Sequence, residues 1–414
     1  MKSVTILRVE TEDRRFDLEA GAGTDAVHNV VQYAFAVTRL IATDGLSGCG
    51  IVLTLGNGNE IVCRLIAALA ELLPKIPIED LMSDFGAVSR ELSDDASLRW
   101  LGPHKGAVHL ALASLTNACF DLWAKARGVP LWRLLLDLSS RELASLLDLS
   151  YLEEDLTREQ AVEMIEAERE RRTGREHILV DGYPGYDTSV GWFQYDDAQL
   201  SDNVKQALDR GFRALKLKVG SRDWRRDVRR ATLLRRLAGA ECRIMLDANQ
   251  QWTVQQAARV CEAVRELDPY WIEEPTHPDD IEGHVRLADR IAPLRIALGE
   301  HVPNRIMFRN FMVSRAMHFA QADCTRLAGV AEFLAVSLLA RRYEMPVVPH
   351  VGDMGQIHQH LVLFNHVALG HPVVFLEHIP HLRKHFVYPA VVENGKYVTT
   401  HEPGLSCDLI PGSR

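Results

Sequence analysis

The chain reads ALKLKV at residues 214–219, RIMLDAN at residues 243–249 and YWIEEP at residues 270–275. Each run is short and largely apolar, carries ionisable side chains toward its end, and is separated from the next by a helix-like segment. Short apolar runs that alternate with helices are typical of a parallel β-sheet built from strand–helix units. The three runs therefore predict an α/β region in the second half of the chain.

The same pattern extends on both sides of these runs. Eight strands are predicted: Pro184–Ser189, Ala214–Val219, Arg243–Asn249, Tyr270–Glu274, Arg295–Glu300, Phe319–Asp323, Pro346–His350 and Val373–Glu377. Helix-like segments separate them. Eight parallel strands alternating with helices is the count of a closed β/α barrel, and such barrels carry their chemistry at the carboxyl ends of the strands.

The predicted strands end in ionisable residues. In chain order these are Lys216 and Lys218, Asp247, Glu273, Glu300, Asp323, His350 and Glu377. Because the carboxyl ends of parallel strands meet at one rim, we expect these side chains to lie close together. Taken singly, each motif also has a structural explanation, such as solvated lysines or a charged loop entry. Taken together, the strand ends indicate an active site.

Three carboxylates stand on consecutive predicted strands, at Asp247, Glu273 and Glu300. Carboxylate oxygens are hard ligands, and neither a cysteine nor a cluster of histidines accompanies them in the sequence. This donor set favours Mg²⁺ over Zn²⁺ as a cofactor.

A base is predicted on each side of this acidic trio. Lys218 precedes it along the barrel and His350 follows it, with Asp323 one strand earlier to accept the ring N–H of His350. This arrangement suits removal of a proton α to a carboxylate, because a metal ion stabilises the enediolate that forms. Lys218 can act as the base if Lys216 and the metal lower its pKa.

These residues resemble the enolase superfamily, in its mandelate-racemase-like branch, through the Lys216-Leu217-Lys218 strand and the three carboxylates. A Lys or His base working with Mg²⁺ is the known pattern of that superfamily. Within the branch, the chain is most similar to the L-fuconate dehydratases. That similarity rests on Leu98–Pro103, Gly182–Pro184, Gly191-Trp192, Asp247–Gln250, Trp271–Thr276 and Gly299–His301.

The resemblance implies a modified (β/α)7β barrel of the TIM type, with an N-terminal α+β capping domain that the C-terminal segment completes. The predicted limits are 1–154 for the capping domain, 155–385 for the barrel and 386–414 for the C-terminal segment. Strand-type runs at Val4–Val9 and Ala34–Ala42, followed by helix-period segments, agree with an α+β capping domain.

The resemblance also implies catalytic roles. Lys218, supported by Lys216, removes the proton at C2 of an acid sugar. His350, backed by Asp323, protonates the departing 3-hydroxyl, and the product is a 2-keto-3-deoxy acid. Glu377 donates a hydrogen bond to the substrate carboxylate in its protonated form, so its pKa should be raised.

Six further residues are predicted to contact substrate: Asp25, His28, Trp100, Tyr195, Asn249 and His301. Asp25 and His28 belong to the capping-domain loop expected to close over the barrel mouth, although turn or surface roles are equally open. Trp100 precedes a long predicted helix, where an ordinary core role is the alternative.

Composition limits the other possibilities. The 414 residues include 47 Lys+Arg and 56 Asp+Glu, a net charge of −9, which argues against a nucleic-acid or anionic-membrane partner. Seven scattered cysteines without a C-x-x-C pair argue against a disulfide framework or a zinc knuckle. No membrane-length apolar stretch or signal peptide is evident, so we expect a cytoplasmic protein. The basic run at 222–230 is interleaved with acids and is expected on a solvated helix face.

The predicted function is that of an Mg²⁺-dependent acid-sugar dehydratase, a lyase that resembles L-fuconate dehydratase and acts on an aldonate, with a homo-oligomer implied by the resemblance. One alternative is a racemase or epimerase of a 2-hydroxy acid, since bases on two sides can exchange the C2 proton in both directions. Another is a catalytically silent member of the superfamily with a structural, binding or regulatory role. The crowding of like charges at one rim argues against a silent member.

Overall fold

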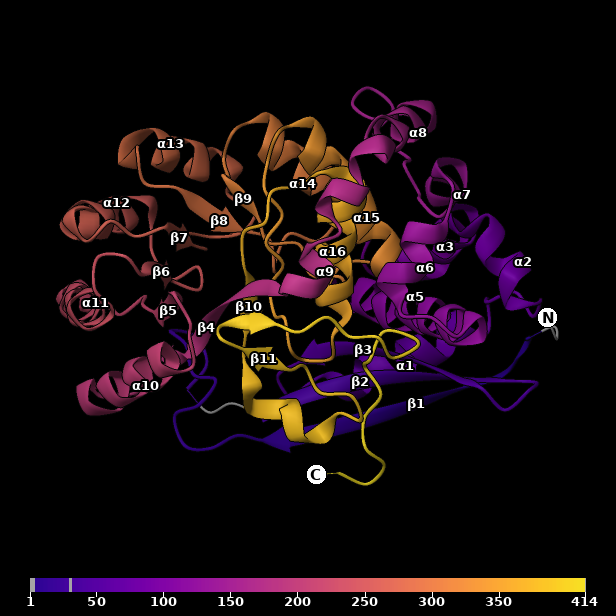
Figure 1. Cartoon of the computed structure of the whole chain (residues 1–414), viewed down its shortest axis with the longest axis horizontal. Coiled ribbons are helices and arrows are strands. Elements are labelled where there is room, and N and C mark those ends of the chain that lie inside the picture. Colours follow the sequence, from indigo (N-terminus) through magenta and orange to yellow (C-terminus); the bar gives the residue numbers. More distant parts are fainter. Residues whose placement is uncertain (1–3, 30–31, 414) are drawn as a thin grey trace.

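The structure is a computed structural model that describes residues 4–29 and 32–413. A set of parallel strands ringed by helices forms one part, and a three-stranded antiparallel sheet with its own helices forms the other (Figure 1). This arrangement is the α/β barrel with an α+β capping domain that the sequence predicts.

The capping sheet consists of β1 (Ile6–Asp17), β2 (Gln32–Ala42) and β3 (Ser47–Thr54). β2 lies in the middle and pairs antiparallel with both neighbours. The long helix α5 (Gly106–Arg127) packs against β2 and β3. Gly50 permits this close approach, because a Cβ there would overlap the backbone of α5. Sequence patterns predict β1 and β2 but not β3, whose glycines weaken the strand signal.

Shorter helices complete the capping part. Those that contact α5 are α1 (Asn59–Ala70), α2 (Ile78–Ser83), α3 (Phe85–Ser93), α4 (Ala96–Leu101) and α6 (Leu131–Asp137). The chain then reaches the barrel through α7 (Ser140–Ser145), α8 (Arg158–Ala167), the 3₁₀ turns η1 (Arg169–Arg171) and η2 (Thr173–Arg175), and α9 (Ile178–Asp181).

The barrel strands run parallel and follow the order of the chain. They are β4 (Tyr183–Gly191), β5 (Ala214–Lys218), β6 (Arg243–Asp247), β7 (Trp271–Glu273), β8 (Ile296–Leu298), β9 (Phe319–Ala320) and β10 (Leu376–His378). The helices between them are α10 (Asp197–Asp209), α11 (Trp224–Ala238), α12 (Val254–Val264) with η3 (Arg265–Leu267), α13 (Ile281–Ile291), α14 (Arg305–Val313), α15 (Val330–Arg342) and α16 (Ile357–Leu369). β4 pairs with both β5 and β10, so the first and last strands meet.

The other predicted strands differ from the structure only at their ends, but two of the eight differ more. The segment 346–350 contributes only an isolated bridge between Val347 and Ala320, because Pro346 and Pro349 have no N–H to donate to a ladder. The last strand lies at 376–378 rather than at 373–377. Both predicted strand-end residues keep their place at the rim, since His350 follows the bridge and Glu377 lies inside β10.

The C-terminal residues contact both parts of the molecule. The hairpin of β11 (Val392–Glu393) and β12 (Lys396–Tyr397) pairs with the start of β4. Further along, the N–H of Leu405 donates to the carboxylate of Asp121 in α5. The predicted domain limits at 154 and 385 stay predictions.

One apolar layer fills the barrel interior beneath the ionisable strand ends. Its members come from successive strands and are Tyr186, Ala214, Met245, Trp271, Ala297, Phe319, Val348 and Val374. Because residues two apart on a strand face the same side, Lys216 lies one step above Ala214, and Asp247 one step above Met245. The layer therefore supports the ionisable side chains from below.

Two exclusions drawn from composition bear on the described residues. Within residues 4–29 and 32–413, no helix combines the length and apolar character needed to cross a membrane. The seven cysteines, all of which lie within these ranges, are free, as the lack of a C-x-x-C pair predicts.

Candidate active site

Strand register brings the first ionisable strand ends together. Lys218 of β5 pairs with Asp247 of β6, and Asp247 pairs with Glu273 of β7. Lys218 Nζ donates to Asp247 Oδ2 across 2.6 Å, so these two side chains face the same side. Glu300 and Asp323 follow β8 and β9 at the same rim.

The backbone turns sharply where the strands end. Asn249, Gln250, Glu274 and Val351 have positive φ values of 43°, 66°, 42° and 56°. Residues other than glycine adopt this left-handed region at a cost in free energy, and such residues gather at functional sites. Three of the four, Asn249, Gln250 and Val351, line the cavity at this rim.

A cavity of about 350 Å³ opens at the strand ends, beneath the capping domain. Its polar side chains are Asp25, His28, Lys218, Asn249, Gln250, Glu300, His301, Arg326, His350 and Glu377. Its apolar and aromatic side chains are Val27, Tyr33, Leu53, Leu55, Trp192, Val351, Met354 and Ile379. Ionisable strand ends thus share one cavity with an apolar surface to which the capping domain and the barrel each contribute four residues.

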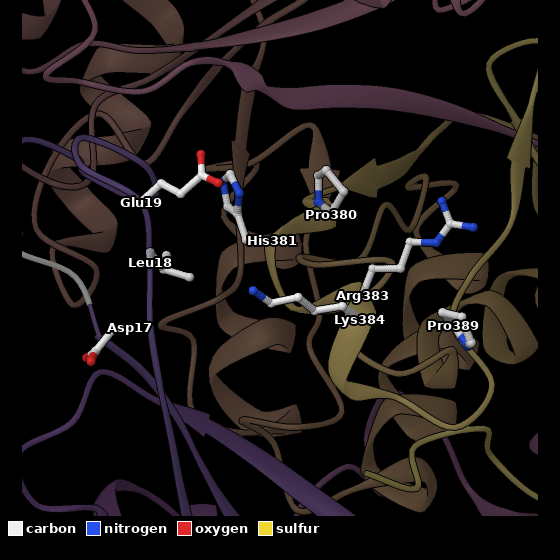
Figure 2. A pocket seen from close by; sticks show the side chains of 8 residues that line it. All are labelled: Asp17, Leu18, Glu19, Pro380, His381, Arg383, Lys384 and Pro389. Carbon is white, nitrogen blue, oxygen red and sulfur yellow. The ribbon is translucent and has the colours of Figure 1, made fainter. Parts of the chain in front are cut away.

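A second cavity, of about 480 Å³, lies between the loop after β1 and the 3₁₀ helix η4 (Pro380–His385) (Figure 2). Its lining is Asp17, Leu18, Glu19, Pro380, His381, Arg383, Lys384 and Pro389. None of these is a strand-end residue. The smaller cavity is therefore the candidate active site, although it encloses less volume.

Lys216 is enclosed and contacts three carboxylates. Its Nζ lies 2.6 Å from Glu273 Oε1, 2.7 Å from Glu377 Oε1 and 3.4 Å from Asp247 Oδ2. Burial disfavours the charge of Lys216, but these carboxylates raise its pKa well above the usual value. Lys216 is therefore a fixed cation in this arrangement.

The pKa shift predicted for Glu377 is wrong for this arrangement, and the shift predicted for Lys218 depends on a bound metal as well as on Lys216. Burial lowers the pKa of Lys218, as does Lys216, but the attraction of Asp247 outweighs both and raises it. Burial raises the pKa of Glu377, but Lys216 and His350 stabilise its carboxylate and lower that pKa to about 2. Both differences arise because side chains from separate strands form ion pairs that a sequence pattern does not specify.

His350 lies against Asp323, as the predicted pair requires. Its Nδ1 is 2.8 Å from Asp323 Oδ2, and its Nε2 is 3.2 Å from Glu300 Oε2. Burial lowers the pKa of His350, but Glu300 and Asp323 raise it to about 9. Thr325 holds Asp323 in turn, since its N–H and its hydroxyl both donate to Asp323 Oδ1 at 2.7 Å. His350 is therefore an oriented imidazolium at the cavity wall.

A second histidine stands beside Glu300. His301 Nδ1 lies 2.8 Å from Glu274 Oε1 and 3.4 Å from Glu300 Oε1. Gln250 Nε2 donates to Glu274 Oε2 at 2.9 Å. Within the part of the chain that the structure describes, Glu274, Glu300 and His301 hold possible metal-ligand atoms within 4.8 Å of one another. The predicted metal ligand is the adjacent Glu273, and replacing each glutamate in turn distinguishes the two sites.

The donor set fits a divalent cation. Four carboxylates, those of Asp247, Glu273, Glu300 and Glu377, face two lysines and one histidine, so negative charge is in excess when all are ionised. Burial disfavours the charged form of a carboxyl group, and it raises the pKa of Glu273 to about 8. Asn249 Oδ1 is buried without a hydrogen-bond partner among the described residues. Surplus carboxylates beside a free amide oxygen are the donor chemistry that Mg²⁺ prefers.

Asp25 and His28 reach the cavity from the capping loop. Asp25 Oδ1 accepts the N–H groups of Val27 and His28, both at 2.7 Å, and Oδ2 lies 2.9 Å from His28 Nδ1. Burial raises the pKa of Asp25, but its hydrogen bonds with His28 lower it below the usual value. Asp25 therefore shapes the loop, and His28 keeps 41% of its side chain exposed at the cavity.

Trp100 and Tyr195 do not line the cavity, contrary to the prediction. Trp100 is 90% exposed on α4, a helix that buries none of its residues. Tyr195 packs its ring against Gly21, where a Cβ would lie 3.2 Å from the ring. Trp100 lies in one of the stretches that carry the family resemblance, and such a stretch does not by itself place a side chain in a cavity.

Sequence patterns do not predict several of the residues that line the cavity. Tyr33 and Leu53 belong to capping strands and carry no motif. Trp192 directly follows β4, so the strand-end rule finds it once apolar residues are included. Arg326 lies three residues after Asp323, and its Nε donates to the carbonyl oxygen of Glu300 at 2.6 Å.

The chain matches known proteins over its whole length. Residues 199–412 match the family model described as Enolase C-terminal domain-like. The chain is 39% identical to human mitochondrial enolase superfamily member 1, over 98% of this chain and 93% of that protein. It is 36% identical to L-galactonate dehydratase of Hypocrea jecorina, over 100% of this chain and 94% of that protein.

Solved structures give the same picture. The crystal structure of human mitochondrial enolase superfamily member 1 has a TM-score of 0.95 at 38% identity, and covers 99% of this chain and 95% of that one. A racemase from Streptomyces coelicolor A3(2), solved with bound magnesium, has a TM-score of 0.76 at 25% identity, and covers 98% of this chain and 97% of that one. These likenesses extend over the capping part as well as the barrel.

Proposed function

Since the chain belongs to the enolase superfamily, we propose that it is an Mg²⁺-dependent acid-sugar dehydratase, a lyase that removes water from an aldonate. The observation that supports this most is the presence of Lys218 and His350 in one cavity. Lys218, the proposed base, contacts Asp247, and Nε2 of His350, the proposed acid, contacts Glu300. Both catalytic groups therefore lie against proposed metal ligands. The dehydratase from H. jecorina named above is a relative with a reaction of this class.

In the proposed reaction, Lys218 takes the proton from C2 and His350 gives a proton to the 3-hydroxyl. The electron pair of the C2–H bond first moves onto the carboxylate group, which becomes an enediolate. It then forms the C2–C3 double bond as the C3–O bond breaks, and the 3-hydroxyl leaves as water with the proton from His350. The enol that remains takes a proton at C3 and becomes the 2-keto-3-deoxy acid. One water is lost overall, and no oxidant or reductant is needed.

Mg²⁺ is the proposed cofactor, with Asp247, Glu273 and Glu300 as its ligands. When bound, it stabilises the negative charge that develops on the substrate carboxylate. Asp247 Oδ2 lies 2.6 Å from Lys218 Nζ, so a ligand role for Asp247 would weaken this ion pair and favour the neutral amine. A neutral Lys218 can accept the C2 proton.

Glu377 is proposed to bind the substrate carboxylate. Its Oε1 accepts from Thr188 Oγ1 at 2.5 Å and lies 2.7 Å from Lys216 Nζ, while its Oε2 accepts the N–H of Val351 at 2.8 Å. These contacts fix its carboxylate at the cavity wall. The predicted donor role requires Glu377 to take up a proton when substrate binds, since its carboxylate is ionised in this arrangement.

Among acid sugars, we propose an aldonate of the L-fuconate type, whose far end is a methyl group. The support is the apolar surface that Val27, Leu53 and Leu55 present to the cavity. A methyl group gains free energy when buried against such a surface, whereas a second carboxylate there would lose its hydration without an ion-pair partner.

The test is turnover of single acid sugars. Purified protein is incubated with Mg²⁺ and L-fuconate, L-galactonate or galactarate, and 2-keto acid is measured as its semicarbazone, with EDTA-treated protein as the control. Faster turnover of L-fuconate than of galactarate supports the proposal. Turnover of galactarate alone would refute the aldonate assignment. Deuterium entering recovered substrate at C2 without loss of water would instead favour a racemase or epimerase.

Cytoplasmic location and homo-oligomeric assembly are further proposals, based on the sequence and on the family resemblance. Cell fractionation tests the location. Light scattering of the purified protein tests the assembly, and a monomeric mass would contradict it.

A further inference from the structure

The basic run at 222–230 contains two enclosed charges. On α11, Asp227 has no exposed surface and Arg230 keeps only 1%, whereas Arg229 and the other arginines around them keep contact with solvent. The interleaved charges of the run predict a solvated face for all of it. Buried charges are costly unless hydrogen bonds compensate them, so the contacts of these two residues indicate what they do.

Arg230 binds backbone carbonyl groups beside two adjacent strands. Its Nη1 donates to the carbonyl oxygen of Lys218 at 3.0 Å, and its Nη2 donates to that of Trp192 at 2.9 Å. A longer contact of 3.4 Å joins Nη2 to the carbonyl oxygen of Tyr195. A guanidinium presents its donors in a rigid planar fork, so these carbonyl groups are held at set positions. Burial lowers the pKa of Arg230 to about 10, which leaves it charged at neutral pH.

Asp227 holds the backbone that follows Lys218. Its Oδ2 accepts the N–H groups of Gly220 at 2.9 Å and of Ser221 at 2.8 Å. Gly220 has a φ of 104°, and a Cβ there would lie 2.7 Å from the Cβ of Ala26 in the capping loop. The loop after Lys218 is therefore confined between α11 and the capping domain.

Trp192 is the aromatic neighbour of Lys218. Lys218 Nζ lies 5.7 Å from the centre of its ring, and both side chains line the cavity. The indole N–H of Trp192 donates to His381 Nε2 at 2.8 Å. His381 also lines the second cavity, where Figure 2 shows it next to Glu19. Trp192 is thus held through its carbonyl oxygen by Arg230 and through its ring by His381.

We propose that Arg230 is a positioning residue that sets the ammonium of Lys218 against the ring of Trp192, and so fixes the direction from which Lys218 reaches the C2 proton. The catalytic consequence rests on the proposed function. The contacts themselves do not.

Two observations favour positioning over simple packing. Arg230 Nε has no hydrogen-bond partner among the described residues, so this side chain is buried at a cost that an apolar residue would not carry. Its two shorter hydrogen bonds, moreover, go to the two residues whose side chains meet in the cavity, Lys218 and Trp192.

The first test compares Arg230→Lys with Arg229→Lys, a matched control on the exposed side of the same helix. Arg230→Lys should lower kcat by between about tenfold and a hundredfold with little change in KM, because a displacement of about 1 Å at a reacting centre has effects of that size. The isotope effect on kcat with C2-deuterated substrate should rise, because removal of the C2 proton becomes slower than the other steps. Arg229→Lys should match the wild type.

The second test needs no turnover. Trinitrobenzenesulfonate reacts with the neutral amine. Labelling of Lys218, read by peptide mass spectrometry, therefore reports how readily its amine leaves the ion pair with Asp247 and meets the reagent. We expect faster labelling in Arg230→Lys than in the wild type or in Arg229→Lys. If Arg230→Lys does not fold by circular dichroism, Arg230→Gln, which keeps an amide donor but loses the planar fork, takes its place with the same expected result.

Unchanged labelling of Lys218 in the folded variant would overturn the inference. Where the wild type turns over an acid sugar, an unchanged kcat and isotope effect in Arg230→Lys would overturn it as well. Absence of turnover by the wild type would overturn the proposed function, and the labelling result then decides the inference by itself.

Discussion

Two adjacent glutamates, Glu273 and Glu274, belong to two different possible metal sites. Glu273 lies 2.6 Å from Lys216 Nζ and accepts the indole N–H of Trp271 at 2.9 Å. Glu274 lies 2.8 Å from His301 Nδ1. Replacing either glutamate with glutamine keeps the size of the side chain and removes its charge, so the pair Glu273→Gln and Glu274→Gln forms its own matched control.

The expected magnitudes depend on whether each carboxylate would bind the proposed ion directly or would act through His301. Glu274 orients His301, which in turn contacts Glu300, and loss of such an orienting partner typically weakens metal binding by about 10- to 100-fold. That range corresponds to about 1.4–2.7 kcal/mol. Loss of a direct ligand should exceed it. We therefore predict that Glu273→Gln raises the Kd for Mg²⁺ by more than about 100-fold and Glu274→Gln by about tenfold.

Isothermal titration calorimetry with MgCl₂, on protein stripped with EDTA and dialysed, measures the Kd of the wild type and of both variants. Circular dichroism establishes that each variant is folded. If Glu274→Gln loses more affinity than Glu273→Gln, the ion lies among Glu274, Glu300 and His301, and the assignment to Asp247, Glu273 and Glu300 is refuted.

Three further predictions concern catalysis and stability. Lys218→Met should lower kcat by about 10²- to 10⁴-fold with Mg²⁺ affinity retained, because only the base is removed. The control is Lys205→Met, at an exposed lysine. Full activity of Lys218→Met would contradict the assignment of the base. Asp323→Asn should lower kcat by a similar factor of about 10²–10⁴, because asparagine does not hold His350 in the same protonation state. Steady-state kinetics measures this effect. An unchanged kcat would rule out a catalytic role for the His350–Asp323 pair. The free energy of unfolding should fall as pH drops from 6.5 toward 3, because burial lowers the pKa of His109 to about 3 while the unfolded chain takes up the proton near pH 6.5. At about pH 4.5 the neutral, buried His109 lowers the free energy of unfolding by about 2–3 kcal/mol relative to pH above 6.5. In urea titrations, the free energy of unfolding of His109→Gln should therefore depend less on pH than that of the wild type. Equal pH dependence in both proteins would refute the reasoning.

The position of the site at the barrel rim could be predicted because it depends on local repeats. Lys218, Asp247 and Glu273 end three successive strands, and parallel pairing brings the ends of successive strands into register. Chain order and strand spacing are both visible in the sequence. The pairing of His350 with Asp323 follows from the same rule applied to the next strands.

The features that sequence did not predict depend on contacts between distant segments. The pKa of Glu377 is low because Lys216, on a different strand, lies against it. Trp100 belongs to a shared motif, but α4 packs none of its residues and leaves it in solvent. Arg230 lies in a run whose composition indicates a surface, and its buried position becomes visible only when α11 is placed against β4 and β5.

Loss of water after proton removal at C2 is the central claim, and one measurement tests it directly. The protein, Mg²⁺ and L-fuconate are incubated in D₂O, and the product is analysed by mass spectrometry and NMR. We predict a 2-keto-3-deoxy acid that has lost one water and carries solvent deuterium at C3, with no product from EDTA-treated protein or from Lys218→Met. Recovery of the sugar acid with deuterium at C2 and no loss of water would contradict the claim. So would recovery of L-fuconate, L-galactonate and galactarate unchanged.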